Sequence, residues 1–188
     1  EDGLLHNKKL ASNMEIFNVL VTADLYDGQY EQALDKLIER SQDYVNNAWF
    51  IPNSLWQAII YGYMGEKELE KQYYETAVAI LEDKVAQNPG DDRYYSSLGK
   101  AYASLGYEQE AIEQGQLAVA CAEKDALQKT VRQEDLARIY VMVGKYSEAI
   151  DIVEDLLNRD CLLTRARLRH DPVWDPLHGH PRFEELLS

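Results

Sequence analysis

Four glycines divide the 188-residue chain at nearly equal intervals, and this spacing limits its fold more than any other feature. Neighbouring glycines are 37, 41 and 38 residues apart; the last three copies have a tyrosine four residues before the glycine, and the first, third and fourth copies have an alanine five residues after it. A period of this length predicts stacked supersecondary units, each too small to bury its own apolar face. The glycines are Gly28, Gly65, Gly106 and Gly144, the tyrosines Tyr61, Tyr102 and Tyr140, and the alanines Ala33, Ala111 and Ala149, with Glu70 replacing the alanine in the second copy.

The residue types in this repeat are those that two antiparallel helices need for close packing. In the clearest copy, Gly99 and Ala118 let two helix axes approach, and Tyr102 fills the remaining space. The turn glycine takes a left-handed backbone conformation that would strain other residues. No stretch alternates as a strand does, so we expect an all-α chain. Helices are predicted near 13–26, 29–46, 52–64, 67–88, 92–105, 108–125, 130–143 and 146–158, with capping-box patterns at Ser12-x-x-Glu15 and Thr130-x-x-Gln133.

The clearest copy, Tyr95-x2-Leu98-Gly99-x2-Tyr102, resembles the tetratricopeptide repeat, a helix-turn-helix unit with the same signature spacing. The resemblance implies an all-α, right-handed α-solenoid of about four helix-turn-helix repeats with a C-terminal cap. We expect the repeat array over residues 1–161, with hairpins near 13–46, 52–88, 92–125 and 130–158. The capping segment is expected over 162–188.

The end of the chain departs from the repeat and resembles a tail found in many bacterial multidomain signalling proteins. In those proteins a tetratricopeptide region follows a serine/threonine kinase, a nucleotide cyclase or a DNA-binding regulator domain. The resemblance implies the C-terminal regulatory or scaffolding part of a bacterial, cytoplasmic signalling protein. Because the chain opens on Glu1 rather than Met, we expect an excised or processed piece without its output domain. The matching tail residues are Asp171, Pro172, Trp174, Asp175, Pro176 and Leu177, followed by Pro181, Arg182 and Phe183.

In tetratricopeptide arrays the first helix of each hairpin lines a concave groove, which predicts a partner-binding face here. Arg93, Lys100 and Arg138 would concentrate positive charge on that face, beside aromatic and aliphatic groups. Such a groove suits an extended or helical peptide with acidic and apolar residues. The carboxylate-clamp pattern of some family members is matched only in part, by Arg93 and Lys100. The predicted groove residues are Asn18, Thr22, Tyr26, Leu55, Ile59, Tyr63, Arg93, Ser97, Lys100, Ser104, Glu134, Arg138 and Met142.

Composition argues against several classes of function. The formal net charge of −14 opposes nucleic acid and anionic membranes, because both would add like charge to an acidic surface. Cys121 and Cys161 form no CxxC pair, which fits a reducing compartment. The sequence contains no glycine-rich phosphate loop, no GxSxG and no HExxH. We therefore expect a non-catalytic protein-interaction module with no catalytic residues, no metal and no cofactor.

Two other functions stay open. The protein could associate with a second copy of itself through its convex or terminal face, which would leave the groove idle. It could also bind a metal ion or a small ligand at its histidine-rich tail, since His178-x-His180 is close enough for one ion. Three arginines that precede this tail form a second basic cluster, called the basic spot, and they could pair with neighbouring acids, with another protein or with water. The tail candidates are His170, Asp171, Asp175, His178 and His180, and the basic spot comprises Arg165, Arg167 and Arg169.

Overall fold

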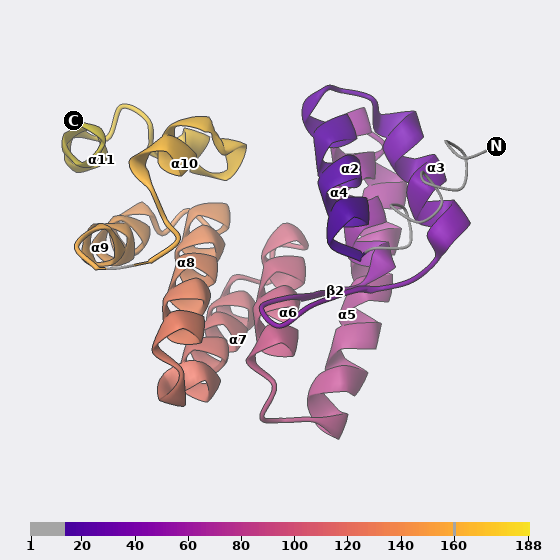
Figure 1. Ribbon diagram of the computed structural model, residues 1–188, viewed down its shortest axis with the longest axis horizontal. Helices are drawn as coiled ribbons and strands as arrows, with labels where there is room; N and C mark the ends of the chain where they lie inside the picture. Colours follow the sequence, from indigo (N-terminus) through magenta and orange to yellow (C-terminus); the bar gives the residue numbers. More distant parts are fainter. Residues whose placement is uncertain (1–13, 160) are drawn as a thin grey trace, which may run out of the picture. The chain divides into compact units, whose positions relative to one another are not determined.

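The computed structural model describes residues 14–159 and 161–188, so the first 13 residues of the predicted array lie outside the described part. Most of the described residues are helical, which confirms the predicted all-α class. The chain divides into two compact units, residues 1–80 and 81–188 (Figure 1). The elements are α2 (Met14–Tyr26), α3 (Tyr30–Arg40), β1 (Tyr44–Val45), β2 (Phe50–Ile51), α4 (Asn53–Met64), α5 (Lys67–Gln87), α6 (Asp92–Ser104), α7 (Glu108–Cys121), η1 (Ala122–Lys124), α8 (Ala126–Met142), α9 (Tyr146–Leu157), α10 (Arg165–His170), η2 (Pro172–Leu177) and α11 (Pro181–Leu187).

In the first unit, the facing sides of α2, α3 and α4 form one apolar core. Phe17 and Val21 of α2 meet Leu37 of α3 and Ile60 of α4 there, and each of the four is at most 8% exposed. A sequence in which apolar residues recur at helical spacing buries them in this way. Helices α2 and α3 therefore form a hairpin whose turn contains Gly28.

Each of the four repeat glycines lies at a turn between two helices, as the sequence predicts. Their φ angles are +71°, +78°, +82° and +78° in chain order, in the left-handed region that favours glycine. At the last three turns, the amide of the residue after the glycine donates to the carbonyl of the repeat tyrosine, which satisfies a carbonyl that the helix leaves unpaired. These bonds run from Glu66 to Tyr61 at 3.0 Å, from Tyr107 to Tyr102 at 3.0 Å and from Lys145 to Tyr140 at 2.8 Å.

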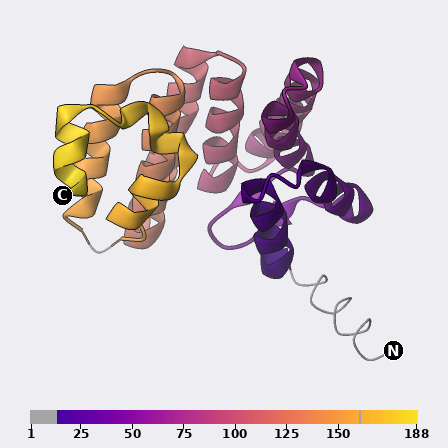
Figure 2. The ribbon, with the colours of Figure 1, turned by 90° about the horizontal axis from the view of Figure 1, so that it is seen from above.

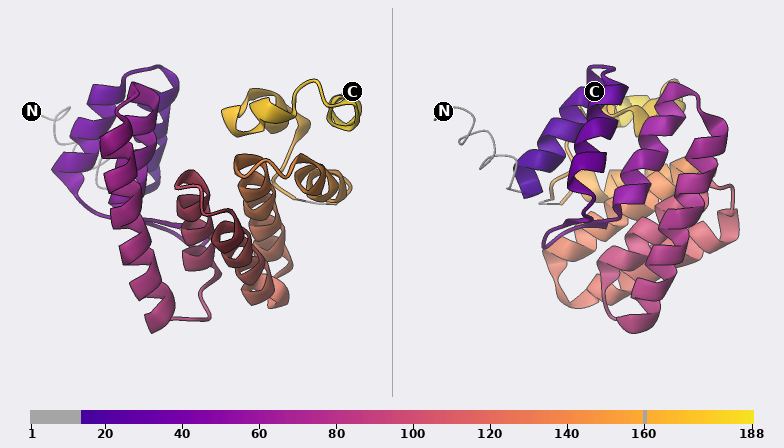
Figure 3. Two further views of the ribbon diagram at one scale, coloured as in Figure 1. Left: turned by 180° about the vertical axis from the view of Figure 1, so that it is seen from behind. Right: turned by 90° about the vertical axis from the view of Figure 1, so that its right-hand side faces the viewer.

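In the second unit, α6 to α9 form two hairpins that pack side by side (Figures 2 and 3). Close contact depends on two glycines. A Cβ atom on Gly99 would lie 2.7 Å from Cδ1 of Ile139 and 3.0 Å from the carbonyl oxygen of Ala111, and one on Gly115 would lie 2.8 Å from Cδ1 of Leu136. The absence of these two side chains lets α8 pack closely against α6 and α7.

The helix predicted over 29–46 is wrong at its C-terminal end, because α3 stops at Arg40. Ser41 takes a left-handed conformation with φ of +43°, and the chain continues into β1 and β2, which pair as antiparallel strands. Between these strands the side chain of Asn46 accepts hydrogen bonds from the amides of Ala48 and Trp49, at 2.8 and 2.7 Å. This local bonding competes with a helix. The expectation that the chain has no strand is therefore also wrong.

Two further helix boundaries differ from the prediction. The helix predicted over 108–125 ends at Cys121 and is followed by the short 3-10 helix η1. Helix α8 begins at Ala126 rather than near 130, because the side chain of Asp125 accepts hydrogen bonds from the amides of Leu127 and Gln128, both at 3.0 Å. An aspartate at this position satisfies amides that the first helical turn leaves unpaired.

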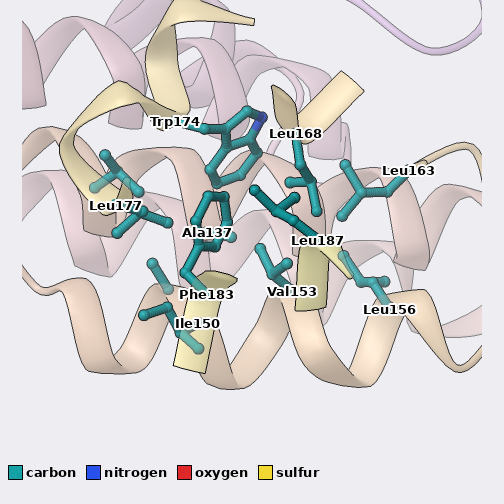
Figure 4. Packing of buried hydrophobic residues seen from close by; sticks show 12 residues of the cluster. Ala137, Ile150, Val153, Leu156, Leu163, Leu168, Trp174, Leu177, Phe183 and Leu187 are labelled. Atoms are coloured by element: carbon teal, nitrogen blue, oxygen red, sulfur yellow. The ribbon is translucent and has the colours of Figure 1, made fainter. Parts of the chain in front are cut away.

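The C-terminal segment shares its core with α8 and α9. Trp174, Leu177 and Phe183 are fully buried and lie in one cluster with Ile150 and Val153 of α9, as the close view shows (Figure 4). The apolar positions of the tail motif are therefore the ones that attach η2 and α11 to the last hairpin. Covering the final apolar face is what a terminal element of a repeat array must do.

The three arginines of the basic spot bind inside the chain. Arg165 donates from Nε to the carbonyl oxygen of Leu186 at 2.8 Å, and Arg169 donates to that of Leu187, at the end of α11. Arg167 pairs with Glu134 of α8. Cations at these carbonyls also complement the negative end of a helix. Of the three possibilities that the sequence leaves open, pairing with an acid holds for Arg167, whereas Arg165 and Arg169 bind backbone carbonyls, which the sequence did not suggest.

Candidate partner-binding face of helices α6 and α8

Four charged side chains and a serine form a network of ion pairs and hydrogen bonds between α6 and α8. Oδ1 of Asp135 lies 2.5 Å from Nζ of Lys100, and Oδ2 lies 2.7 Å from both Nη1 of Arg132 and the hydroxyl oxygen of Ser96. Nε of Arg132 also lies 2.7 Å from Oδ2 of Asp92, and the Arg132 side chain is fully buried. Two positive and two negative charges therefore balance each other here. The network fixes the first helices of the third and fourth hairpins to each other.

Burial and neighbouring charge act in opposite directions at the centre of this network. Burial alone would raise the pKa of the Asp135 carboxyl, but the charges of Lys100 and Arg132 and the hydrogen bonds outweigh it, so that this pKa is lowered. Burial lowers the pKa of the Lys100 ammonium, and Asp135 offsets only part of that effect. Asp135 is therefore the carboxylate that both cations share.

The C-terminal segment contacts two of the predicted groove residues, Glu134 and Arg138 of α8. Arg138 lies 2.8 Å from Glu134 on its own helix and 2.7 Å from Asp171 of the tail. Glu134 also lies 2.9 Å from Arg167 of α10, so the ion pairs alternate in charge between the two segments. The Arg138 guanidinium is 5.2 Å from the ring centre of Trp174, in a cation–π arrangement. Glu134 and Arg138 therefore hold the tail of the chain.

Positive charge on this face is compensated by carboxylates of the same chain. Arg93 makes two contacts with Asp91, from Nη2 at 2.6 Å and from Nε at 2.9 Å. The hydrogen bond from Arg93 is the main reason that the pKa of Asp91 lies below its usual range. Lys100 has Asp135, and Arg138 has Glu134 and Asp171. The three basic residues of the predicted groove thus present much less net charge than the sequence suggests.

The other predicted groove residues differ widely in exposure. In the second unit Ser97 is buried, and Ser104 is half-buried and donates to the carbonyl oxygen of Lys100 at 3.1 Å. Met142 is 39% exposed at the end of α8. In the first unit Leu55 is buried, whereas Tyr26 and Tyr63 are 62% and 51% exposed. The remaining positions, Asn18, Thr22 and Ile59, are half-buried.

Sequence reasoning missed the residues that organise this face. Arg132, Asp135 and Asp92 were absent from the predicted groove, although they contribute its central ion pairs. One signal was available: Arg132 and Asp135 stand three residues apart among the apolar residues Val131, Leu136 and Ala137. Opposite charges at that spacing face each other on a helix, and charges between buried positions require partners.

The tail histidines lie outside any metal-like cluster. Within residues 14–159 and 161–188, no three histidine, cysteine, aspartate or glutamate side chains are grouped as a metal ion would need. Asp171 instead binds Arg138, and His178 lies 3.4 Å from Glu184. In that same part of the chain, every helix is too short or too polar to cross a lipid bilayer.

Comparison with known proteins finds distant structural similarity only. No protein-family model and no curated protein matches the sequence. One similar crystal structure contains nearly identical TPR-like repeats of a kinesin light chain from Podosopora anserina. It has 22% sequence identity to this chain and a TM-score of 0.47, and the match covers 94% of this chain and 92% of that chain. A single-substitution form of those repeats has 22% sequence identity and a TM-score of 0.48, and the match covers 94% of this chain and 92% of that chain. MamA AMB-1 gives 18% identity and a TM-score of 0.38 over 93% of this chain and 86% of that chain.

Proposed function

We propose that this protein is a non-catalytic protein–protein interaction module that binds a peptide or protein partner along the groove side of its first helices. The observation that carries this proposal is the ion-pair network of Asp135, which connects α6 to α8 through side chains that already have partners within the chain. A face that is ordered before binding loses little conformational entropy when a partner binds. This property suits a scaffold for recognition.

The chemistry of the face favours a partner segment with apolar side chains. Its basic residues already have carboxylate partners, so an acidic peptide would compete with Asp91, Asp135 or Asp171 and gain little. Met142, Tyr26 and Tyr63, by contrast, expose apolar surface in their respective units. We therefore place aliphatic or aromatic anchors in the partner, with hydrogen-bonding groups in a supporting role.

The wider role follows from the resemblance of the tail. We propose that the chain is the C-terminal regulatory or scaffolding part of a bacterial signalling protein in the cytoplasm. In support of this proposal, the tail motif has a consistent structural use: Asp171 caps η2 and binds Arg138, and Trp174 and Phe183 enter the core of the last hairpin. Residues 162–188 then act as a cap that belongs to the array.

Met142→Glu should reduce binding of a groove ligand at least tenfold. Peptides are first selected from a random 16-residue display library against the full chain, and their affinities are then measured by fluorescence anisotropy. A carboxylate at position 142 removes the apolar contact, and burying its charge against an apolar anchor of the ligand is unfavourable. Leu117→Glu on α7 is the matched control, because Leu117 is 38% exposed and Met142 is 39% exposed. Equal losses in the two variants, or a loss in the control alone, would contradict the groove assignment.

One observation favours homo-oligomerisation as a second candidate. Val19 and Leu20 of α2 are 63% and 41% exposed, although α2 already buries Phe17 and Val21 on its other side. A helix that is apolar on both sides gains by packing against a second surface. If that surface is another copy, light scattering at micromolar concentration should give a dimer mass, and Val19→Lys should restore the monomer mass. A monomer in the unmodified protein would remove this candidate.

A further inference from the structure

Two exposed tyrosines of the second unit lie beside a surface ion pair that joins neighbouring hairpins. Tyr107 precedes α7 and is 50% exposed, and Tyr146 begins α9 and is 40% exposed. The residues next to them in sequence, Glu108 and Lys145, meet at 3.0 Å. The two tyrosines are therefore brought to the same edge, beside the α6–α7 and α8–α9 turns. We call Tyr107, Glu108, Lys145 and Tyr146 the turn edge.

The turn edge retains aromatic surface that packing does not use. Tyr107 meets Tyr102 edge to face, with ring centres 5.9 Å apart, yet half of the Tyr107 surface stays exposed. Exposed tyrosines supply a large contact area at small entropic cost and are enriched at protein interfaces. None of the four turn-edge residues is among the predicted groove residues.

Carboxylates give the turn edge a negative potential. The Tyr102 hydroxyl donates to Glu82 at 2.6 Å, and burial together with Glu82 and Glu110 raises the pKa of Tyr102 to about 12. Glu148 acts electrostatically on Lys145, which already pairs with Glu108. Among these described residues, the carboxylates of Glu82, Glu108, Glu110 and Glu148 outnumber the ammonium of Lys145.

We infer that the turn edge binds an arginine-containing basic segment of a protein partner. A guanidinium group stacks flat on a tyrosine ring and donates hydrogen bonds to a neighbouring carboxylate, so the turn edge offers both of its preferred contacts. A lysine side chain gains the charge attraction but fits the flat ring less well. An acidic segment would meet like charge. The expected occupant is thus opposite in charge to the acidic peptide that the sequence predicts for the groove.

The test uses a fluorescein-labelled decapeptide of alternating arginine and alanine, titrated with the full chain and followed by fluorescence anisotropy. Matched decapeptides with lysine or glutamate in place of arginine separate stacking from charge. We expect the arginine peptide to bind most tightly, the lysine peptide about threefold more weakly and the glutamate peptide not at all. Combining Tyr107→Leu with Tyr146→Leu should weaken the arginine peptide about tenfold, because leucine keeps apolar bulk but has no π face.

Tyr63→Leu is the matched control, since Tyr63 is 51% exposed but lies in the first unit. It should leave the affinity for the arginine peptide within twofold of the unmodified protein. The inference is overturned if arginine and lysine peptides bind equally and the double leucine variant binds as the unmodified protein does, because net charge alone then explains the binding. If the double variant does not fold, Glu110→Gln with Glu148→Gln should weaken the arginine peptide about threefold at low salt, and an unchanged affinity would also overturn it. Neither outcome depends on Met142 or on groove binding.

Discussion

Asp135→Ala should destabilise the protein by about 3–5 kcal/mol, the range expected when one partner of a buried ion pair is removed. The variant removes one carboxylate partner of the fully buried Arg132 and the carboxylate that pairs with Lys100. It also removes the hydrogen-bond acceptor of Ser96. Urea denaturation followed by circular dichroism measures the loss, and the groove side of α6 and α8 should become more mobile in hydrogen exchange.

The charge of Asp135, rather than its shape, should account for most of this loss. Asp135→Asn keeps an acceptor of nearly the same size, so a cost close to that of alanine would identify the charge as the cause. Because the pKa of Asp135 is lower in the folded protein than in the unfolded chain, its contribution is complete above the unfolded pKa, near pH 4. It is lost as the pH falls through the lower folded pKa. The unmodified protein should therefore lose stability more steeply than Asp135→Asn in that acid range.

An apolar replacement of the whole cluster provides the control for this prediction. Lys100→Met, Arg132→Met and Asp135→Leu together remove the desolvated charges and keep the volume, which in other buried clusters is often neutral for stability. Asp92 can remain, because it stands in the first turn of α6, where a negative charge is favourable. If Asp135→Ala alone cost less than about 1 kcal/mol, the network would not be what holds α6 to α8.

The fold could be predicted because its information is local and repeated. Gly106, Ala111 and Tyr102 each act within one hairpin, so their spacing specifies a turn and a close contact without knowledge of the remainder of the chain. The strand pair was missed for the opposite reason. Its turn depends on one side chain, Asn46, bonding to nearby amides in preference to continuing a helix, and periodicity does not report that competition.

The candidate face could be predicted only in part, because its electrostatics are set by partners that are distant in sequence. The register of the first helices correctly put Lys100 and Arg138 on α6 and α8. It could not show that Lys100 faces Asp135, or that Asp171 reaches Arg138 from 33 residues away. Counting the basic residues expected on this face thus predicted a positively charged groove, whereas in the folded chain each of these basic residues pairs with a carboxylate. Specific pairing across helices is a property of packing and is not visible in one helical period.

Trp174→Ala should destabilise the second unit by about 3–5 kcal/mol, the usual cost of removing a fully buried large aromatic side chain. Trp174 packs in one cluster with Ala137, Ile150 and Phe183, so the cavity would lie between the tail and both helices of the last hairpin. Arg138 would also lose the ring beneath its guanidinium group, which weakens its contact with Asp171. Hydrogen exchange should show lost protection first in α10 and α11 and then in α9.

Two control variants separate this role of Trp174 from general sensitivity of the tail. Trp174→Phe retains most of the apolar volume and should cost less than half as much as alanine. Leu162→Ala changes a residue of the same segment that is 52% exposed, and its effect should stay within about 0.5 kcal/mol. Because the tail covers the apolar side of α9, Trp174→Ala should also bind a hydrophobic dye or aggregate on mild heating, which Leu162→Ala should not. Unchanged protection of α9 in Trp174→Ala would show that the last hairpin is stable without its cap.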